Sequence, residues 1–177
     1  MSGNFYGYTV EKTQERDMFL LLAWSTDGFS IKAEERLRFW LKQGDGCESF
    51  VVREGKNTLG FFQAEHVGAG DQVRIHMQAS PLASPKAILR GISKLVPLIE
   101  KALALRGVRA IFFTSHSSAM AQFMAERHGY ERAGDGGADG MIMAKGIGQP
   151  LTPGAERAGE RGSGVRGAEP KSARAAL

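Results

Sequence analysis

The sequence predicts an α/β protein, an α+β domain with one mixed sheet and helices on both faces, in the order β-α-α-β-β-β-α-β-α-β-β. Two observations support this fold class. Apolar residues recur with strand-like and helix-like spacing in alternating segments. A long helix also joins two apolar strands, which favours a right-handed crossover between parallel neighbours. The 177 residues are 42% hydrophobic and 24% charged, which is typical of one globular core.

The first third of the chain predicts one strand and two helices. Residues 6–11 are rich in β-forming side chains, whereas residues 15–24 carry apolar side chains at helical spacing. Ser30 can cap a second helix that ends before Gly44. The two helices follow each other directly, before the main run of strands.

The middle of the chain predicts an antiparallel meander and then a long helix. Three strand segments, at 49–53, 59–65 and 72–78, are separated by the turn sequences EGKN and VGAG. Ser84 and Pro85 then supply an N-cap and a proline at the first helical position, where a missing N–H does no harm. We expect this helix to reach about Leu105.

The last part of the domain predicts a strand at 110–114, a helix at 118–128, and strands at 130–133 and 141–145. Residues 148–177 contain no aromatic side chain and are mostly Gly, Ala, Arg, Glu and Pro. We therefore expect a domain over residues 1–147 and a flexible tail over 148–177.

The tail has five basic and three acidic residues. This charge leaves open a contact with nucleic acid or an acidic partner, but the interspersed signs favour a plain solvated extension.

Composition excludes several classes of protein. Cys47 is the single cysteine, so the chain cannot be a disulfide scaffold or hold a cysteine-rich zinc site, and the four histidines lack close ligand spacing. We therefore expect no metal. The apolar stretches are far shorter than the roughly 20 residues that span a bilayer, and the segment MSGNFYGY lacks a charged region before an apolar one. These features predict a cytoplasmic protein without a membrane partner.

The element order and the run HSSAMAQFMAERHGYERA together resemble the GNAT (Gcn5-related N-acetyltransferase) family. The fourth helix of that family is typically written Asn-x-x-Ala-x-x-x-Tyr-x-x-x-Gly-Phe. Ser118, Ala121, Gly129 and Tyr130 fall on this spacing, with Ser for Asn and Tyr for Phe. The likeness covers residues 5–147 in topology. It implies transfer of an acyl group from acetyl-CoA to a primary amine, on a small molecule or a protein.

The resemblance also implies where acetyl-CoA binds. In the family, the strand matching 73–78 separates from the strand matching 110–114, and the pantetheine arm of CoA inserts between them. The pyrophosphate lies at the start of the long helix, where free amides attract anions. The implied contacts are Gln78, Ala79, Lys86, Ala87, Arg90, Gly91 and Ser118. The paired glycines of the family's phosphate loop are absent, and Lys86 and Arg90 could equally be solvated residues of a helix surface.

For the chemistry, strand alternation in VRIHMQ places Arg74, His76 and Gln78 on one face. His76 is the best candidate for the base that deprotonates the amine, because an imidazole titrates near neutral pH. Glu65 on the preceding strand could orient His76 or serve in its place. The alternative is that His76 is a half-buried sheet residue with a satisfied hydrogen bond.

Two functions stay open at this point. One is the acyltransferase described above. The other is a catalytically silent GNAT-like assembly or binding protein with protein partners, such as a virion-associated protein of a phage. A loop stiffened by proline, the basic tail and Ala125 in place of the family's helix tyrosine favour the second.

Overall fold

The computed structural model describes residues 2–24, 31–136 and 140–148 of the 177-residue chain. The helix cap expected at Ser30 and the expected tail, apart from Gly148, lie outside the described residues. Within those residues, no helix is long and apolar enough to cross a membrane.

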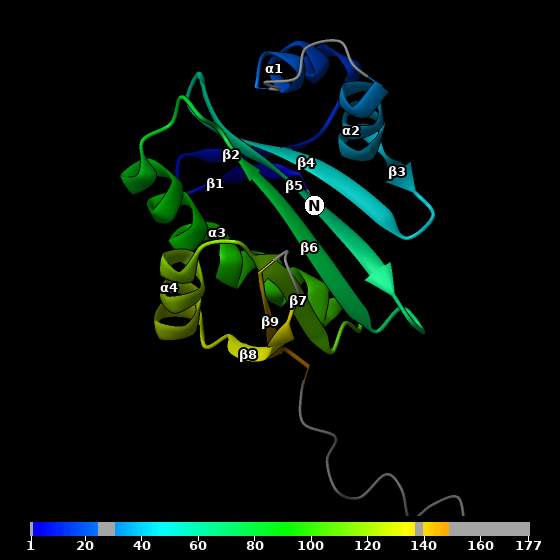
Figure 1. Cartoon of the computed structure of the whole chain (residues 1–177), viewed down its shortest axis with the longest axis vertical. Helices are drawn as coiled ribbons and strands as arrows, with labels where there is room; N and C mark the ends of the chain where they lie inside the picture. Colours follow the sequence, from blue (N-terminus) through cyan, green and yellow to red (C-terminus); the bar gives the residue numbers. More distant parts are fainter. Residues whose placement is uncertain (1, 25–30, 137–139, 149–177) are drawn as a thin grey trace, which may run out of the picture.

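The described residues form one mixed sheet with helices on both faces (Figure 1). The elements are β1 (Gly3–Phe5), β2 (Tyr8–Lys12), the 3-10 turn η1 (Glu15–Asp17), α1 (Met18–Ala23), α2 (Ile31–Leu41), β3 (Gln43–Gly44), β4 (Cys47–Glu54), β5 (Asn57–Val67), β6 (Gln72–Ala79), α3 (Pro85–Leu105), β7 (Ala110–Ser115), α4 (Ser118–His128), β8 (Glu131–Asp135) and β9 (Met141–Gly146). The strand order is β1-β2-β4-β5-β6-β7-β9-β8, with β3 paired to β4. The α/β class and the parallel pair around the long helix, here β6 and β7, are confirmed.

The prediction was incomplete at the N-terminal edge of the sheet. The strand expected over residues 6–11 is present as β2, which begins at Tyr8, but a second short strand, β1, precedes it and is joined to it by a turn at Tyr6 and Gly7. Both turn residues have positive φ, at 53° and 85°, as a two-residue hairpin turn requires. A tyrosine rarely adopts this conformation, so the local sequence gave little sign of the turn.

The sheet is covered differently on its two faces (Figure 1). On one face, Leu21 and Trp40 from α1 and α2 pack with Val51 and Phe61 of the sheet. On the other face, α3 and α4 cover two apolar clusters, one centred on β2, β4 and β5 and one on β7 and β9. The chain therefore builds three layers with the sheet in the middle.

The central strands β6 and β7 stay together over a short distance. They pair in parallel at Gln72 with Ala110, Val73 with Ile111, and Arg74 with Phe112. Beyond Arg74, β6 remains bonded to β5, and β7 remains bonded to β9. The two strands therefore separate toward their C-terminal ends, as the resemblance implied.

His128 ends α4 in a largely buried position, with 9% of its surface exposed. Its Nε2 atom has no hydrogen-bond partner among the described residues. Burial lowers the pKa of His128, and Lys145 acts in the same direction, whereas the Glu100 carboxylate opposes the shift. Protonation of His128 is therefore harder in the folded chain than in the unfolded one.

We expect the free energy of unfolding to fall as the pH drops from 7 to 5. Below about pH 6.5 the unfolded chain binds a proton at His128 that the folded chain resists, so protons favour unfolding. The variant His128→Gln should lose less stability over this range in urea denaturation. His116→Gln, which changes an exposed histidine, is the control. Equal losses in wild type and His128→Gln would contradict this assignment.

Candidate functional site

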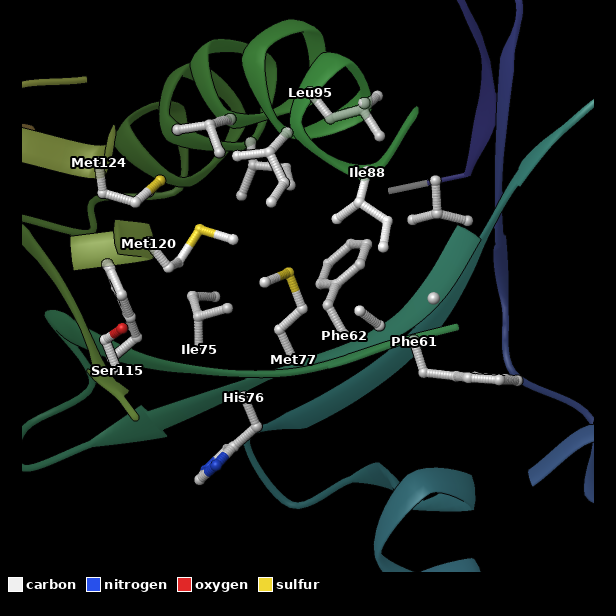
Figure 2. A pocket seen from close by; sticks show the side chains of 18 of the residues that line it. Phe61, Phe62, Ile75, His76, Met77, Ile88, Leu95, Ser115, Met120 and Met124 are labelled. Atoms are coloured by element: carbon white, nitrogen blue, oxygen red, sulfur yellow. The ribbon is translucent and has the colours of Figure 1, made fainter. Parts of the chain in front are cut away.

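The separation of β6 and β7 is accompanied by a cavity of about 480 Å³. Figure 2 shows Ile75 and Met77 of β6 pointing into it from the sheet, with Ile88 and Leu95 of α3 opposite and Met120 of α4 beside them. The volume lies within the range of roughly 300 to 1,000 Å³ that small-molecule sites occupy. A cavity of this size could admit a ligand between the strands.

His76 lies on the opposite face of β6. Its ring points away from Ile75 and Met77, toward α2 (Figure 2), and meets the Phe39 ring edge-on at 5.0 Å between centroids. Phe39, Trp40 and His76 still line the cavity, so the cavity extends to the α2 face of the sheet. The alternation predicted for this strand is confirmed, and His76 faces the covering helix across the sheet from α3.

Glu65 lies next to His76, across the β5–β6 ladder. Its Oε2 atom is 3.4 Å from His76 Nε2 and 3.7 Å from Arg74 Nη1. The side chains of His76 and Glu65 are 34% and 37% exposed, so water reaches both. The carboxylate can hold the imidazole in one orientation. The arrangement is suited to accepting a proton on the α2 face.

The start of α3 offers little free backbone to an anion. Pro85 has no N–H, the Ala87 N–H donates to Ser84 Oγ at 3.2 Å, and the Ile88 N–H donates to the Ser84 carbonyl. In the part of the chain that the structure describes, neither the Lys86 N–H nor the exposed Lys86 ammonium has a partner, so both remain free for a ligand. Lys86 is thus the residue here best placed to meet a phosphate.

Arg90 and Gly91 make their contacts within the protein. The Arg90 Nη2 atom donates to both Glu54 carboxylate oxygens, at 2.9 and 3.1 Å, and Arg90 Nε donates to the Tyr8 hydroxyl. Gly91 is buried, and a Cβ added there would lie 3.2 Å from Leu59 Cδ1. These contacts tie α3 to β2, β4 and β5.

The other residues implied for acetyl-CoA divide into two groups. Ala79, at the end of β6, lines the cavity, as Gly91 does. Gln78, Ala87 and Ser118 do not line the cavity. Two residues that come just before Ser118 in the chain do line it, namely His116 and Ser117.

Sequence reasoning missed the α3 side of the cavity. Ile88 and Ile92 line it, as does Met120 of α4. Their spacing is that of an ordinary buried helix face. The same spacing occurs whether the helix packs against a filled core or borders a cavity, so the sequence cannot distinguish the two. The single available sign was the expected separation of the two strands.

Comparisons with known proteins give a consistent result for the fold. No protein-family model matches the chain, and no curated protein matches it. Among solved structures, the ribosomal-protein-S18-alanine N-acetyltransferase of Escherichia coli superimposes with a TM-score of 0.58 at 17% identity, over 82% of this chain and 97% of that one. An aminoglycoside 6'-acetyltransferase type Ii gives 0.60 at 17% identity, over 80% and 98%.

A third solved structure is a complex with bound ligands. The spermidine N-acetyltransferase of Vibrio cholerae, in complex with CoA and spermine, gives a TM-score of 0.59 at 13% identity, over 80% of this chain and 96% of that one. At these identities the likeness establishes the fold. The chain therefore has the fold of the GNAT (Gcn5-related N-acetyltransferase) proteins.

Proposed function

We propose that this protein is an N-acyltransferase that moves an acyl group from acetyl-CoA to a primary amine. The observation that carries the proposal is the cavity between the separating strands, which reaches His76 and Phe39 on one face and α3 on the other. A donor held from the α3 side and an amine arriving from the α2 side could meet in this gap. The N-acetyltransferases that share the fold support the reaction class.

The protein's own groups can hold acetyl-CoA in this gap. Beyond Arg74, the edges of β6 and β7 that face each other carry backbone N–H and C=O groups outside their mutual ladder. Such groups need partners, and the amides of a pantetheine arm have the matching donors and acceptors. Lys86 at the start of α3 would meet the pyrophosphate, with its ammonium and its backbone N–H.

His76 is the proposed base. The thioester supplies an activated acyl group: the amine nitrogen bonds to the carbonyl carbon, the C–S bond breaks, and the amine's proton ends on the CoA sulfur. Before it reaches the sulfur, that proton passes from the amine to His76 on the α2 face, where the Glu65 carboxylate, 3.4 Å away, stabilises the imidazolium. Ala125 stands where the family has a tyrosine, so His76 or water returns the proton. We propose no covalent intermediate on the enzyme.

The first test is isothermal titration of acetyl-CoA into the full chain and into two variants. We expect micromolar binding to wild type, and about tenfold weaker binding to Lys86→Ala because a charged phosphate contact is lost. Arg90→Ala is the matched control. It removes a cation one turn away on the same helix, but that cation is already paired with Glu54, so we expect a smaller change in affinity and a lower melting temperature.

Two results would count against this assignment. Equal weakening by Lys86→Ala and Arg90→Ala would remove the distinction between a free and a paired cation. No heat and no thermal shift with wild type at millimolar acetyl-CoA would reject acyl-CoA binding altogether. That second result would favour the catalytically silent assembly or binding protein, which Ala125 at the position of the family's tyrosine also supports.

The second test concerns His76. The assay uses acetyl-CoA with each of three amines: spermidine, a peptide that begins with alanine, and kanamycin. With any amine that reacts, we expect His76→Ala to lower kcat/KM about 100-fold, as loss of a general base does. Glu65→Gln should have a smaller effect, because His76 remains in place and loses only the contact with the Glu65 carboxylate at 3.4 Å. CoA release is the measurement.

His66→Ala is the matched control for this test. His66 lies near the end of β5, where its Nδ1 atom is 3.0 Å from the Gly70 carbonyl, and it does not line the cavity. We expect its rate to stay within about twofold of wild type. A His76→Ala enzyme with wild-type kcat/KM would show that His76 is only a sheet residue.

A further inference from the structure

The α3 side of the cavity is lined by apolar side chains. We define the acyl chamber as the part enclosed by side chains of β5, β6 and α3, namely Phe62, Ile75, Met77, Ile88, Ile92 and Leu95. We infer that this chamber holds an alkyl chain, so that the preferred donor is a medium-chain acyl-CoA with about six to eight acyl carbons. The inference rests on the proposed function and specifies its donor.

The chemistry of the chamber wall favours an alkyl chain over the other parts of the donor. All six side chains are hydrocarbon or thioether, and none offers a hydrogen-bond donor or a strong acceptor to an amide or a phosphate. An amide buried there without a hydrogen bond would be strongly disfavoured, because it would lose its bonds to water and gain none. The pantetheine amides therefore belong at the open edges of β6 and β7, and a methylene chain belongs in the chamber.

The volume also exceeds what an acetyl methyl group needs. An apolar cavity of roughly 150 Å³ is large enough to bind benzene, which has six carbons. The whole cavity here measures about 480 Å³. Space remains for several methylenes beside the part of the donor that lies between the strands.

Methionines make the chamber adaptable. Met77 forms part of its wall and is half exposed, while Met120 and Met124 of α4 border the same cavity (Figure 2). Their unbranched thioether side chains can rearrange around chains of different length. The chamber and His76 lie on opposite faces of β6, so a longer acyl chain would not compete with the amine.

The experiment compares octanoyl-CoA, acetyl-CoA and free CoA by isothermal titration into the full chain. Every methylene that leaves water adds to affinity, so we expect octanoyl-CoA to bind at least about tenfold more tightly than acetyl-CoA. Ile88→Phe should fill the chamber and reduce this preference to less than about threefold. Ile92→Phe repeats the test one turn further along α3.

Leu89→Phe is the matched control. Leu89 neighbours Ile88 on the same helix but does not line the cavity, so its variant should keep the wild-type preference. Melting temperatures report whether each variant is folded.

The outcomes separate the inference from the proposed function. Equal or weaker binding of octanoyl-CoA relative to acetyl-CoA would overturn the chamber and leave the acetyltransferase proposal standing. A preference for octanoyl-CoA that survives in folded Ile88→Phe and Ile92→Phe would also overturn it. If none of the three ligands binds to wild type, the proposed function fails, and the chamber assignment fails with it.

Discussion

The parting of β6 and β7 is the constraint on which the rest of the site depends. The two strands share three residue pairs up to Arg74 and Phe112, and each then keeps a different partner, β5 or β9. Because each strand stays bonded on its outer side, the sheet does not unravel where the inner ladder stops. The inner edges are left with backbone groups that water or a ligand must satisfy. A gap in the middle of a sheet is thereby made stable and receptive to a ligand.

This gap connects two different environments. On the α3 face the side chains of Ile75 and Met77 border an apolar space, and on the α2 face His76 and Glu65 form a solvated polar pair. The difference follows from strand alternation, which sends successive side chains to opposite faces. An apolar space and a polar pair therefore lie on either side of one strand.

The position of α3 is fixed independently of any ligand. Ser84 and Pro85 set where the helix begins, and Arg90 joins Glu54 and Tyr8 on the neighbouring strands. Gly91 brings the helix backbone close to Leu59, where a larger side chain would push it away. Helix α3, which covers the cavity, is thus held in place by contacts that include the Arg90 guanidinium, whereas the Lys86 side chain is exposed to solvent.

The sequence by itself determined the order of the elements apart from the short strands β1 and β3, the start of α3 and the two faces of β6, because caps and alternation are read within a few residues. It also reached the fold family through the spacing of Ser118, Ala121, Gly129 and Tyr130. Only the tertiary structure decided that Arg90 is paired with Glu54, 36 residues away, and that an apolar helix face borders a cavity. Contacts between segments so distant in the chain depend on how the layers pack, and a local pattern of residue types carries no information on that packing.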